Sequence, residues 1–306
     1  MNNNNVLNIL WSWFDSHALS GLSLKPFRVQ WIRIIPFIVL HLACFGVFWV
    51  GWSWAAVVVA VLMYAIRMFA ITGFYHRYFS HRSFKTSRIG QFLFALLGAT
   101  ATQRGALWWA SHHRTHHRDP DGPGDVHSPH RDGFWWSHCL WFTCDAHFQT
   151  DYSKIKDLAK YPELVFLNRF DVLVPICFAL GLLGLGSMLN LYWPQLGTSG
   201  LQILAWGYFI STTVLAHATF TINSLSHKWG TRDYDTQDQS RNNFFLAMLT
   251  FGEGWHNNHH RFPGSVRQGL KWWQIDLTYY GLVVMERVGL IWKLNPPPSH
   301  SRRVRP

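Results

Sequence analysis

Residues 54–81 are WAAVVVAVLMYAIRMFAITGFYHRYFSH, an apolar run that ends in a histidine-containing segment. Its apolar part, Trp54–Gly73, holds about 20 residues, which is the length that a helix needs to cross a hydrocarbon core of about 30 Å. His76 and His81 follow directly after it. The stretch therefore predicts a membrane-spanning helix that carries two imidazoles at one end.

Three further apolar stretches of similar length predict spans, namely 31–52, 170–191 and 201–222. Only 14% of the 306 residues are charged, whereas an average soluble domain has about 25%. No Lys or Arg occurs from residue 34 to residue 66 or from residue 170 to residue 227. This asymmetry argues against buried helices of a soluble core.

The basic residues also predict the orientation of the spans. The connections at 51–53 and 192–200 contain no Lys or Arg. By the positive-inside rule, the N-terminus and the segments around 75–169 and 223–294 then lie in the cytoplasm. We expect an all-α integral membrane fold with four transmembrane helices and a cytoplasmic helical cap formed by these two segments.

We expect one domain over residues 1–306. Residues 1–24 lack the basic start of a secretory signal, and 7–22 are expected to lie along the membrane surface. The proline- and arginine-rich tail 295–306 is expected to be disordered. The cysteines show no CxxC spacing and are expected to be reduced and not to bind metal: Cys44, Cys139, Cys144 and Cys177.

The net charge is +11, which raises the question of a nucleic-acid partner. The chain contains no nucleic-acid-binding motif and no dense Lys/Arg stripe. We therefore exclude nucleic acid and expect the lipid bilayer to be a partner.

Nine of the 18 histidines form a pattern of clustered boxes. One box is His-Arg-Tyr-Phe-Ser-His, two are His-x-x-His-His triples, and one histidine follows the fourth predicted span in Asn-Ser-Leu-Ser-His. In chain order they are His76, His81, His113, His116, His117, His227, His256, His259 and His260.

The spacing of these histidines predicts a metal site. Residues at i, i+3 and i+4 share a helix face, so each triple is expected to aim three imidazoles at one locus. The pair at i, i+5 does not share a face of an ideal helix and fits a helix end. Nine imidazoles exceed the needs of one ion, so two ions are expected.

The ligand type narrows the choice of metal. Imidazole suits zinc, copper, iron or nickel, and a closed zinc site would need only four ligands. About nine ligands over two ions leave room for an exchangeable position, which favours a redox-active pair that handles oxygen. The other histidines are expected to support the site or to be structural: His17, His41, His112, His127, His130, His138, His147, His217 and His300.

From about residue 64 to residue 260 the sequence resembles the membrane fatty acid desaturases, specifically the stearoyl-CoA desaturase type. The shared elements are the segments 76–81, 113–117, 223–227 and 256–260, in this order and around four predicted spans.

The resemblance implies a di-iron centre whose direct ligands are the nine histidines, with Asn223 reaching one metal through a water. It implies that O2 and two electrons are used to form a cis double bond near carbon 9 of a fatty acyl chain. It also implies a surface helix at 88–101 and an acyl tunnel that bends near Gln103, Trp109 and Thr219, all of which are present.

Two departures bear on the partners. CoA-specific members carry Arg-Asp where this chain has Ser111-His112, although Arg104, Arg118, Arg131 and Lys228 are available for phosphates. A CoA thioester is thus the first choice of acyl carrier. Because the chain contains no fused redox domain, a separate ferredoxin- or cytochrome b5-type donor with its reductase is expected.

Three other functions remain open on the sequence: a related hydroxylase, an alkene- or acetylene-forming enzyme, and a desaturase of intact lipids. A metal transporter is less favoured, because transporters place ligands near the bilayer midplane. The tunnel floor is expected at Met68 and Tyr64, which lie two and three turns before His76.

Overall fold

The computed structural model describes residues 3–18 and 29–297, and these are mostly helical. The longer helices are α1 (Asn3–Trp11), α2 (Ile35–Ala43), α4 (Trp54–Phe69), α5 (Arg88–Ala99), α6 (Ala106–Arg118), α8 (Pro162–Arg169), α9 (Leu173–Tyr192), α11 (Ser211–Ser224) and α14 (Leu277–Arg287). The short helices are α3 (Val47–Val50), α7 (Lys156–Ala159), α10 (Gly200–Leu204), α12 (Phe244–Leu249) and α13 (His256–Arg261). Strands β1 (Lys85–Thr86) and β2 (Ile291–Trp292) form one small antiparallel pair.

Three π-helical segments interrupt this pattern. They are η2 (Ala70–Ser80), which continues α4, η3 (Trp136–Leu140), and η8 (Ala205–Ile210), which joins α10 to α11. Single 3-10 turns lie at Cys44–Gly46, Trp141–Thr143, Asp145–His147, Tyr152–Lys154, Pro194–Leu196 and Leu225–His227.

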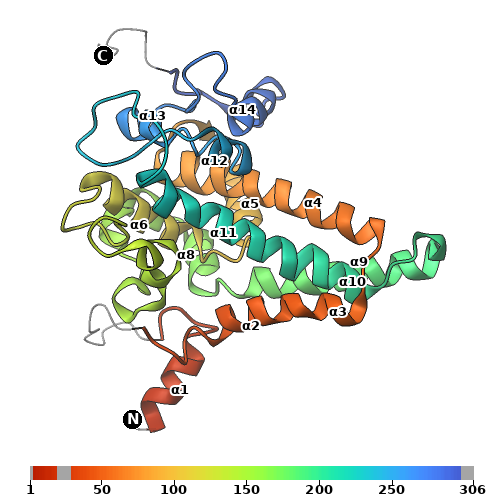
Figure 1. Ribbon diagram of the computed structural model, residues 1–306. Helices are drawn as coiled ribbons and strands as arrows, with labels where there is room; N and C mark the ends of the chain where they lie inside the picture. Colours follow the sequence, from red (N-terminus) through yellow and green to blue (C-terminus); the bar gives the residue numbers. More distant parts are fainter. Residues whose placement is uncertain (1–2, 19–28, 298–306) are drawn as a thin grey trace.

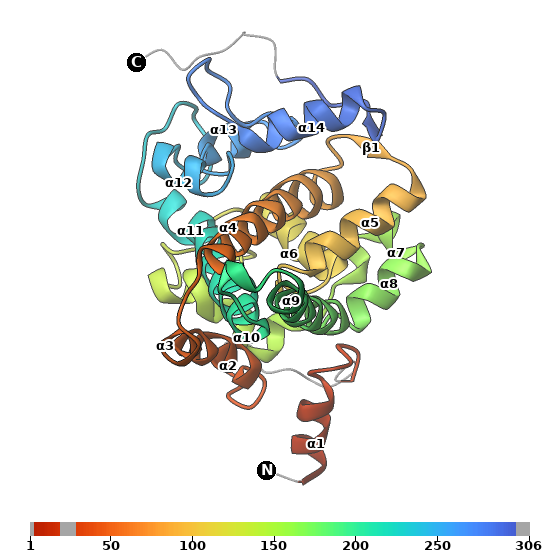
Figure 2. The same ribbon diagram turned by 90° about the vertical axis from the view of Figure 1, so that its right-hand side faces the viewer.

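Among the described residues, three helices are long and apolar enough to cross a membrane: Trp54–Ser80, Leu173–Tyr192 and Gly200–His227. They correspond to three of the four predicted spans. In Figures 1 and 2 they run side by side with α2–α3 and form a stem, and the cap lies toward one end of it. This arrangement is consistent with an integral membrane protein.

The remaining predicted span, 31–52, is not confirmed at full length. Its helix covers only Ile35–Val50 and includes a 3-10 turn, so it is about 24 Å long, less than the hydrocarbon thickness. Pro36 lies in its first turn, and Gly51 ends it with a φ of 68°. Arg33, just before it, is buried and pairs with Asp145 of the cap at 2.6 Å.

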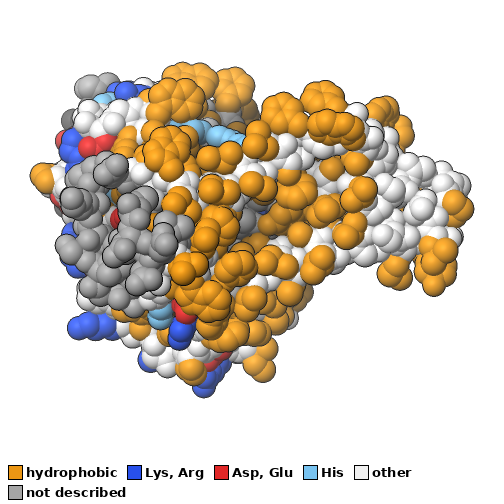
Figure 3. All heavy atoms as spheres, turned by 90° about the horizontal axis from the view of Figure 1, so that it is seen from below, with side chains coloured by type: hydrophobic (Ala, Val, Ile, Leu, Met, Phe, Trp, Pro, Cys, Tyr) orange, Lys and Arg blue, Asp and Glu red, His pale blue; other side chains and the backbone are white. Residues whose placement is uncertain are grey.

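The surface of the stem is apolar. Phe48 and Trp49 are 79% and 82% exposed at its far end, and hydrophobic side chains cover the face seen in Figure 3, while Lys and Arg gather at the cap. Exposed apolar surface of this extent marks contact with lipid or with a partner. Two aromatic residues at the far end, Trp52 and Trp54, fit the headgroup belt.

Serine side chains begin the helices of the stem. The Ser53 hydroxyl accepts a hydrogen bond from the Ala56 amide at 3.2 Å, and the Ser199 hydroxyl accepts one from the Gln202 amide at 3.2 Å. Each satisfies an amide that has no partner within its helix. A Cβ at Gly186 would lie 2.6 Å from the Ser199 carbonyl oxygen, so this glycine lets α9 and α10 approach closely.

The one charge inside the α4 part of the stem is satisfied by neutral groups. Arg67 is buried, and its guanidinium donates to the Thr212 hydroxyl at 2.6 Å, the Thr100 carbonyl at 3.2 Å and the Ser211 hydroxyl. Such a residue in a spanning helix is retained only where its donors find partners. Arg67 thus holds α4 to the helix that carries η8.

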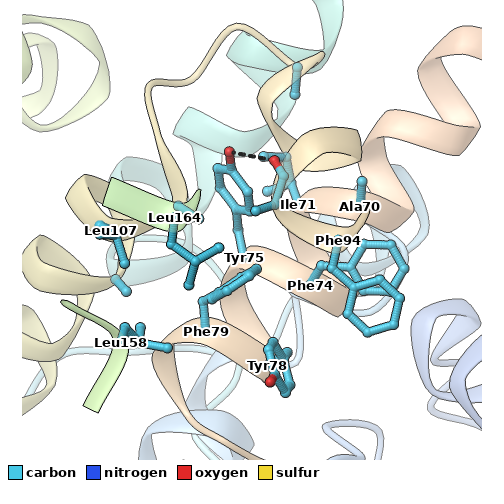
Figure 4. Close-up of a cluster of buried hydrophobic side chains, with 14 of the residues drawn as sticks. Ala70, Ile71, Phe74, Tyr75, Tyr78, Phe79, Phe94, Leu107, Leu158 and Leu164 are labelled. Atoms are coloured by element: carbon cyan, nitrogen blue, oxygen red, sulfur yellow. Dashed lines mark hydrogen bonds between the residues drawn. The ribbon is translucent and has the colours of Figure 1, made fainter. Parts of the chain in front are cut away.

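The main hydrophobic core lies where η2 enters the cap. Phe74 stacks on Phe94 of α5 with ring centroids 3.9 Å apart, and Tyr75 and Phe79 fill the space beside Leu107 of α6 (Figure 4). These side chains are buried. Their packing fixes η2 against α5 and α6, and it therefore sets the positions of the histidines on η2 and α6.

The structure also bears on the predictions for the two ends of the chain. Helix α1 exposes Leu7 and Trp11, in keeping with a surface helix, although residues 19–22 lie outside the described part. The predicted disordered tail begins at least one residue too early, because Asn295 exchanges backbone hydrogen bonds with Ser83 and Val266. Residues 298–306 lie outside the described part.

Candidate metal centre

The first histidine pair lies at a helix end, as predicted, but the helix there is a π-helix. Helix η2 carries His76, and His81 is its C-terminal cap residue. Because a π-helix closes its hydrogen bonds between residues five apart, such residues come nearly above one another. The Nε2 atoms of His76 and His81 are 3.1 Å apart. Residues five apart do not share a face of an ideal α-helix, and it is the π-helix that brings these two rings together.

The two triples are each divided between two clusters, which corrects the expectation of one locus per triple. His113 and His117 of α6 face one cluster, and His116 faces the other. In α13 the division is reversed, because His259 joins the first cluster while His256 and His260 join the second. This division follows from helix geometry. On an α-helix residues i and i+4 are about 40° apart around the axis, whereas residue i+3 lies about 60° from residue i on the other side.

Two groups of imidazoles result, and together they contain all nine predicted histidines. The first group holds His76, His81, His113, His117 and His259, and the second holds His116, His227, His256 and His260. Within each group the candidate ligand atoms lie within 4.8 Å of one another. The contact between His81 and His113, at 2.7 Å between Nε2 atoms, is typical of the first group.

Four carboxylates orient four of these rings. Asp125, Asp121 and Asp238 accept hydrogen bonds from Nδ1 of His116, His227 and His260 at 3.0, 3.0 and 2.6 Å. Glu253 contacts Nδ1 of His76. With Nδ1 engaged in this way, Nε2 points into the cluster with its lone pair free, as in metal sites where a carboxylate holds the ligand histidine.

Burial keeps most of the imidazoles neutral. It lowers the pKa of His113, His117, His256 and His259 well below the ordinary value, and it lowers the pKa of His260 to about 4 in spite of Asp238. Burial also lowers the pKa of His116, but the charge of Asp125 outweighs this and the net shift is upward. Neutral imidazole is the form that binds metal.

The four carboxylates were not predicted from the sequence. Asp121 and Asp125 lie in the acidic turn directly after the second box, a signal that could have been used. Glu253 lies three residues before the third box. Asp238 gives no such signal, because it comes from an irregular segment far from His260 in the chain.

Other histidines surround the clusters or lie apart from them. His127 is 3.5 Å from Asp125, and the His130 ring bonds the His227 carbonyl at 2.8 Å. His41, His217 and His138 form a chain between α2, α11 and η3 with nitrogen–nitrogen distances of 3.0 Å. These three do not belong to either cluster.

Two cavities meet at the clusters. A chamber of about 520 Å³ and a narrow cavity of about 40 Å³ share four lining residues, Trp109, His113, Thr219 and Asn223. The chamber continues past Gln103 toward α2 and α9, and the narrow cavity continues past Thr72 to Met68. The shared residues show that the two cavities adjoin, with His113 between them and with His76, His116 and His256 lining the narrow one.

The predicted substrate residues are distributed along the two cavities. Trp109 stacks on His113 with centroids 4.8 Å apart, and the Gln103 amide donates to the Thr219 hydroxyl at 3.1 Å. Met68 is buried and lines the narrow cavity. Tyr64 lines neither cavity; its hydroxyl donates to the Leu249 carbonyl at 2.6 Å and so ties α4 to α12.

The donor set fits two metal ions that accept nitrogen ligands. The nine imidazoles are mostly neutral and buried, and the five of the first group exceed the four ligands of a closed zinc site. Asn223 lines both cavities beside His113. The histidine clusters are typical of di-iron desaturases and are consistent with a di-metal site.

Comparison with known proteins agrees with this site. The fatty acid desaturase family model matches residues 52–283. The chain is 38% identical over 271 residues to the sn-1 stearoyl-lipid 9-desaturase of Anabaena variabilis, covering 88% of this chain and 94% of that one. It is 36% identical over 279 residues to the sn-2 palmitoyl-lipid 9-desaturase of Nostoc sp. (strain 36), covering 89% and 93%.

A relative with another acyl carrier is also similar. The acyl-CoA C20 Delta5-desaturase of Anemone leveillei is 37% identical over 227 residues, covering 72% of this chain and 68% of that one. The relatives therefore do not single out the stearoyl-CoA type that the sequence resembles. The match over most of the chain and the histidine clusters agree on the broader group: the chain belongs to the membrane fatty acid desaturase family and is an oxidoreductase of lipid metabolism.

Proposed function

We propose that this enzyme introduces a cis double bond near carbon 9 of a saturated acyl chain, using O2 at two iron ions. The nine histidines of the two clusters would be the ligands, with Asn223 supplying a water-mediated contact to one ion. Bound iron would supply the oxygen activation that removes two hydrogens. The observation that carries the proposal is the pair of adjoining cavities, which are mostly apolar and are lined at their junction and in the narrow one by members of both histidine clusters.

The residues of this chain would place the acyl chain and exclude water. Trp109 and Thr219 line both cavities, so a chain threaded through the two must pass them. The Gln103–Thr219 hydrogen bond fixes the polar groups at the junction. Such positioning leaves one stretch of methylenes beside the metals, which is how a desaturase selects a carbon.

For the acyl carrier we infer a membrane lipid in place of the CoA thioester expected from the sequence. The chamber is lined by Val39 of α2 and Ile176 of α9, which are 52% and 42% exposed on the stem. The chamber therefore reaches the surface of the stem that would contact lipid. Near its polar end Arg104 is paired with Asp171 at 2.8 Å, which leaves it less available for a CoA phosphate.

Two further observations bear on the carrier. Ser111-His112 replaces the Arg-Asp of CoA-specific members, and two relatives are described as stearoyl-lipid and palmitoyl-lipid desaturases. CoA thioester is the second candidate, favoured by the acyl-CoA relative. A transporter is disfavoured, because the clustered histidines lie at the ends of the helices Trp54–Ser80 and Gly200–His227 and on α6 and α13, and not midway along the stem.

The test is a reconstituted reaction. Purified enzyme in nanodiscs receives O2, a ferredoxin- or cytochrome b5-type donor with its reductase, and either distearoyl phosphatidylcholine or stearoyl-CoA. We expect an oleoyl lipid as product, no turnover without the donor, and lower rates at high salt, because screening weakens attraction to the basic cap. If stearoyl-CoA gives product and the lipid gives none, the proposal of a lipid carrier is overturned. A hydroxylated product would overturn the proposal of desaturation.

We further propose that the active site faces the cytoplasm and that the narrow cavity ends at Met68. Met68→Trp should shorten the preferred acyl chain, because Met68 is buried and lines the narrow cavity, where a larger side chain would occupy space. Tyr64→Ala should admit longer chains, because Tyr64 lies a turn deeper and holds α12 in place. Both shifts are measured by gas chromatography of the products from a series of lipids with about 14 to 20 acyl carbons.

The matched control for these cavity variants is Val61→Trp, since Val61 is exposed on the same helix. That change should leave the chain-length profile unaltered. If Met68→Trp and Val61→Trp give the same profile as the unchanged enzyme, the acyl chain ends elsewhere.

A further inference from the structure

An exposed apolar surface lies on the cap, away from the acyl cavity. We call it the C-terminal apolar patch. It is formed by Trp229, Phe244, Phe245, Leu249, Leu277, Tyr280, Val284 and Val288. Phe245 is 69% exposed and stacks against Trp229, and Val284 is 58% exposed. Neither residue lines the chamber or the narrow cavity beside the histidine clusters.

Helix α14 has one face that is buried and another face that is apolar but exposed. Leu277, Tyr280, Val284 and Val288 recur at helical spacing on the exposed face. Thr278 and Leu282, on the opposite face, are fully buried. The fold therefore uses one side of α14 for packing and leaves the other without a partner among the described residues.

The packed side of α14 rests on the last part of the long helix Trp54–Ser80. The Thr72 and Thr278 hydroxyls are 2.6 Å apart. A Cβ at Gly281 would lie 2.4 Å from the Phe69 ring, so this glycine makes room for Phe69. Helix α14 thus lies beside residues 69–73 and not beyond the end of the helix, as Figures 1 and 2 also show.

Helix α12 is attached farther down the same helix. The Tyr64 hydroxyl donates to the Leu249 carbonyl at 2.6 Å. Counted from Trp54 at the far end, Tyr64 is about 15 Å, Phe69 about 22 Å and Gly73 about 28 Å along the axis. A hydrocarbon core is about 30 Å thick. A bilayer that covers the helix from Trp54 would therefore extend past Leu249 and reach α14.

We propose that the C-terminal apolar patch is inserted in the plane of the bilayer, in the leaflet nearer the histidine clusters. The occupant of this face is thus lipid, because α12 and α14 adjoin the apolar helix α4 at Tyr64 and Phe69. An in-plane helix with one apolar face is bound in this manner at the boundary between headgroups and acyl chains.

Basic residues at the end of α14 fit the same leaflet. Lys85, Arg287 and Lys293 are exposed around the β1–β2 pair, where Lys85 is aligned with Trp292. Their charges would lie at headgroup level beside the inserted helix. The patch should therefore bind more firmly to a leaflet that contains anionic lipid, at about 1 kcal/mol per basic residue near the surface.

The test uses the unchanged full chain in nanodiscs of phosphatidylcholine and phosphatidylglycerol. Phospholipid with a diazirine in its acyl chain labels residues in contact with lipid on photolysis, and hydroxyl radicals label residues in contact with water. We expect carbene label on Phe245 and Val284, with hydroxyl-radical oxidation about tenfold below that of the exposed loop around Asp235, because water is scarce at that depth. Omitting phosphatidylglycerol should lower the carbene label on residues 284–288.

A double variant, Val284→Glu with Val288→Glu, provides the control. It leaves the buried face of α14 unchanged, and it should lose the carbene label on α14 and gain oxidation there. Oxidation of Phe245 and Val284 at the rate of the Asp235 loop, without carbene label, would overturn the proposal and favour a protein partner. The measurement needs no electron donor and no turnover, so its outcome is independent of the proposed reaction.

Discussion

Replacement of His117 by alanine should abolish desaturation and remove one of two metal ions, and His260→Ala should do the same at the other cluster. Each ring belongs to a different group: His117 lies 2.9 Å from His259, and His260 lies 3.3 Å from His116, between Nε2 atoms. Deleting either leaves its group one ligand short. Both groups are needed if O2 is to be reduced by a pair of ions, so activity should fall below detection in each variant.

The readout for these variants is metal per chain by mass spectrometry, measured beside activity. We expect about two irons in the unchanged protein and about one in each variant, in line with two separate ligand groups. His17→Ala is the matched control, because His17 bonds Tyr152 at 2.9 Å and belongs to neither group. Active enzyme that contains only zinc would contradict the redox interpretation, and loss of all metal from one variant would contradict separate sites.

Which cluster each part of a triple joins could not be predicted from spacing alone. The sequence pattern identifies which histidines converge, since the triples at 113–117 and 256–260 follow or precede apolar helices. It does not show that His116 joins the second group while His113 and His117 join the first, or that His259 joins the first group while its neighbours join the second. That depends on how α6 and α13 face each other, which is a property of tertiary packing and not of either helix.

The π-helix at η2 was hidden for a similar reason. Residues 70–80 look like the end of an ordinary spanning helix. The wider turn is stabilised by contacts outside it, such as Tyr75 against Gly98, where a Cβ would lie 2.1 Å from the ring. Composition predicted three spans well, because burial in lipid depends on apolar length. It overestimated the span at 31–52, where Arg33 and its partner Asp145 belong to the cap.

A second large effect is expected at Arg77, where Arg77→Met should destabilise the cap by about 3–5 kcal/mol. Arg77 is buried between two carboxylates. Its guanidinium donates to Asp276 at 2.9 Å and to Glu253 at 3.1 Å, and also to the Val266 carbonyl at 2.8 Å. Removing the cation leaves two buried carboxylates without their counter-charge, which costs more than the ion pair itself contributes.

The loss would spread to the metal centre, because Glu253 also contacts Nδ1 of His76, and Asp276 caps α14 by accepting from the Tyr279 amide at 2.9 Å. We expect the midpoint of thermal unfolding in detergent to fall by on the order of 10 °C. Arg77→Lys should recover little, since an ammonium cannot donate to both carboxylates in the plane that a guanidinium allows.

Arg88→Met, which breaks the exposed pair with Glu163, is the control and should leave the midpoint unchanged. An unchanged midpoint in Arg77→Met as well would mean that the two carboxylates are protonated or solvated, and the buried network would then not hold His76 in place.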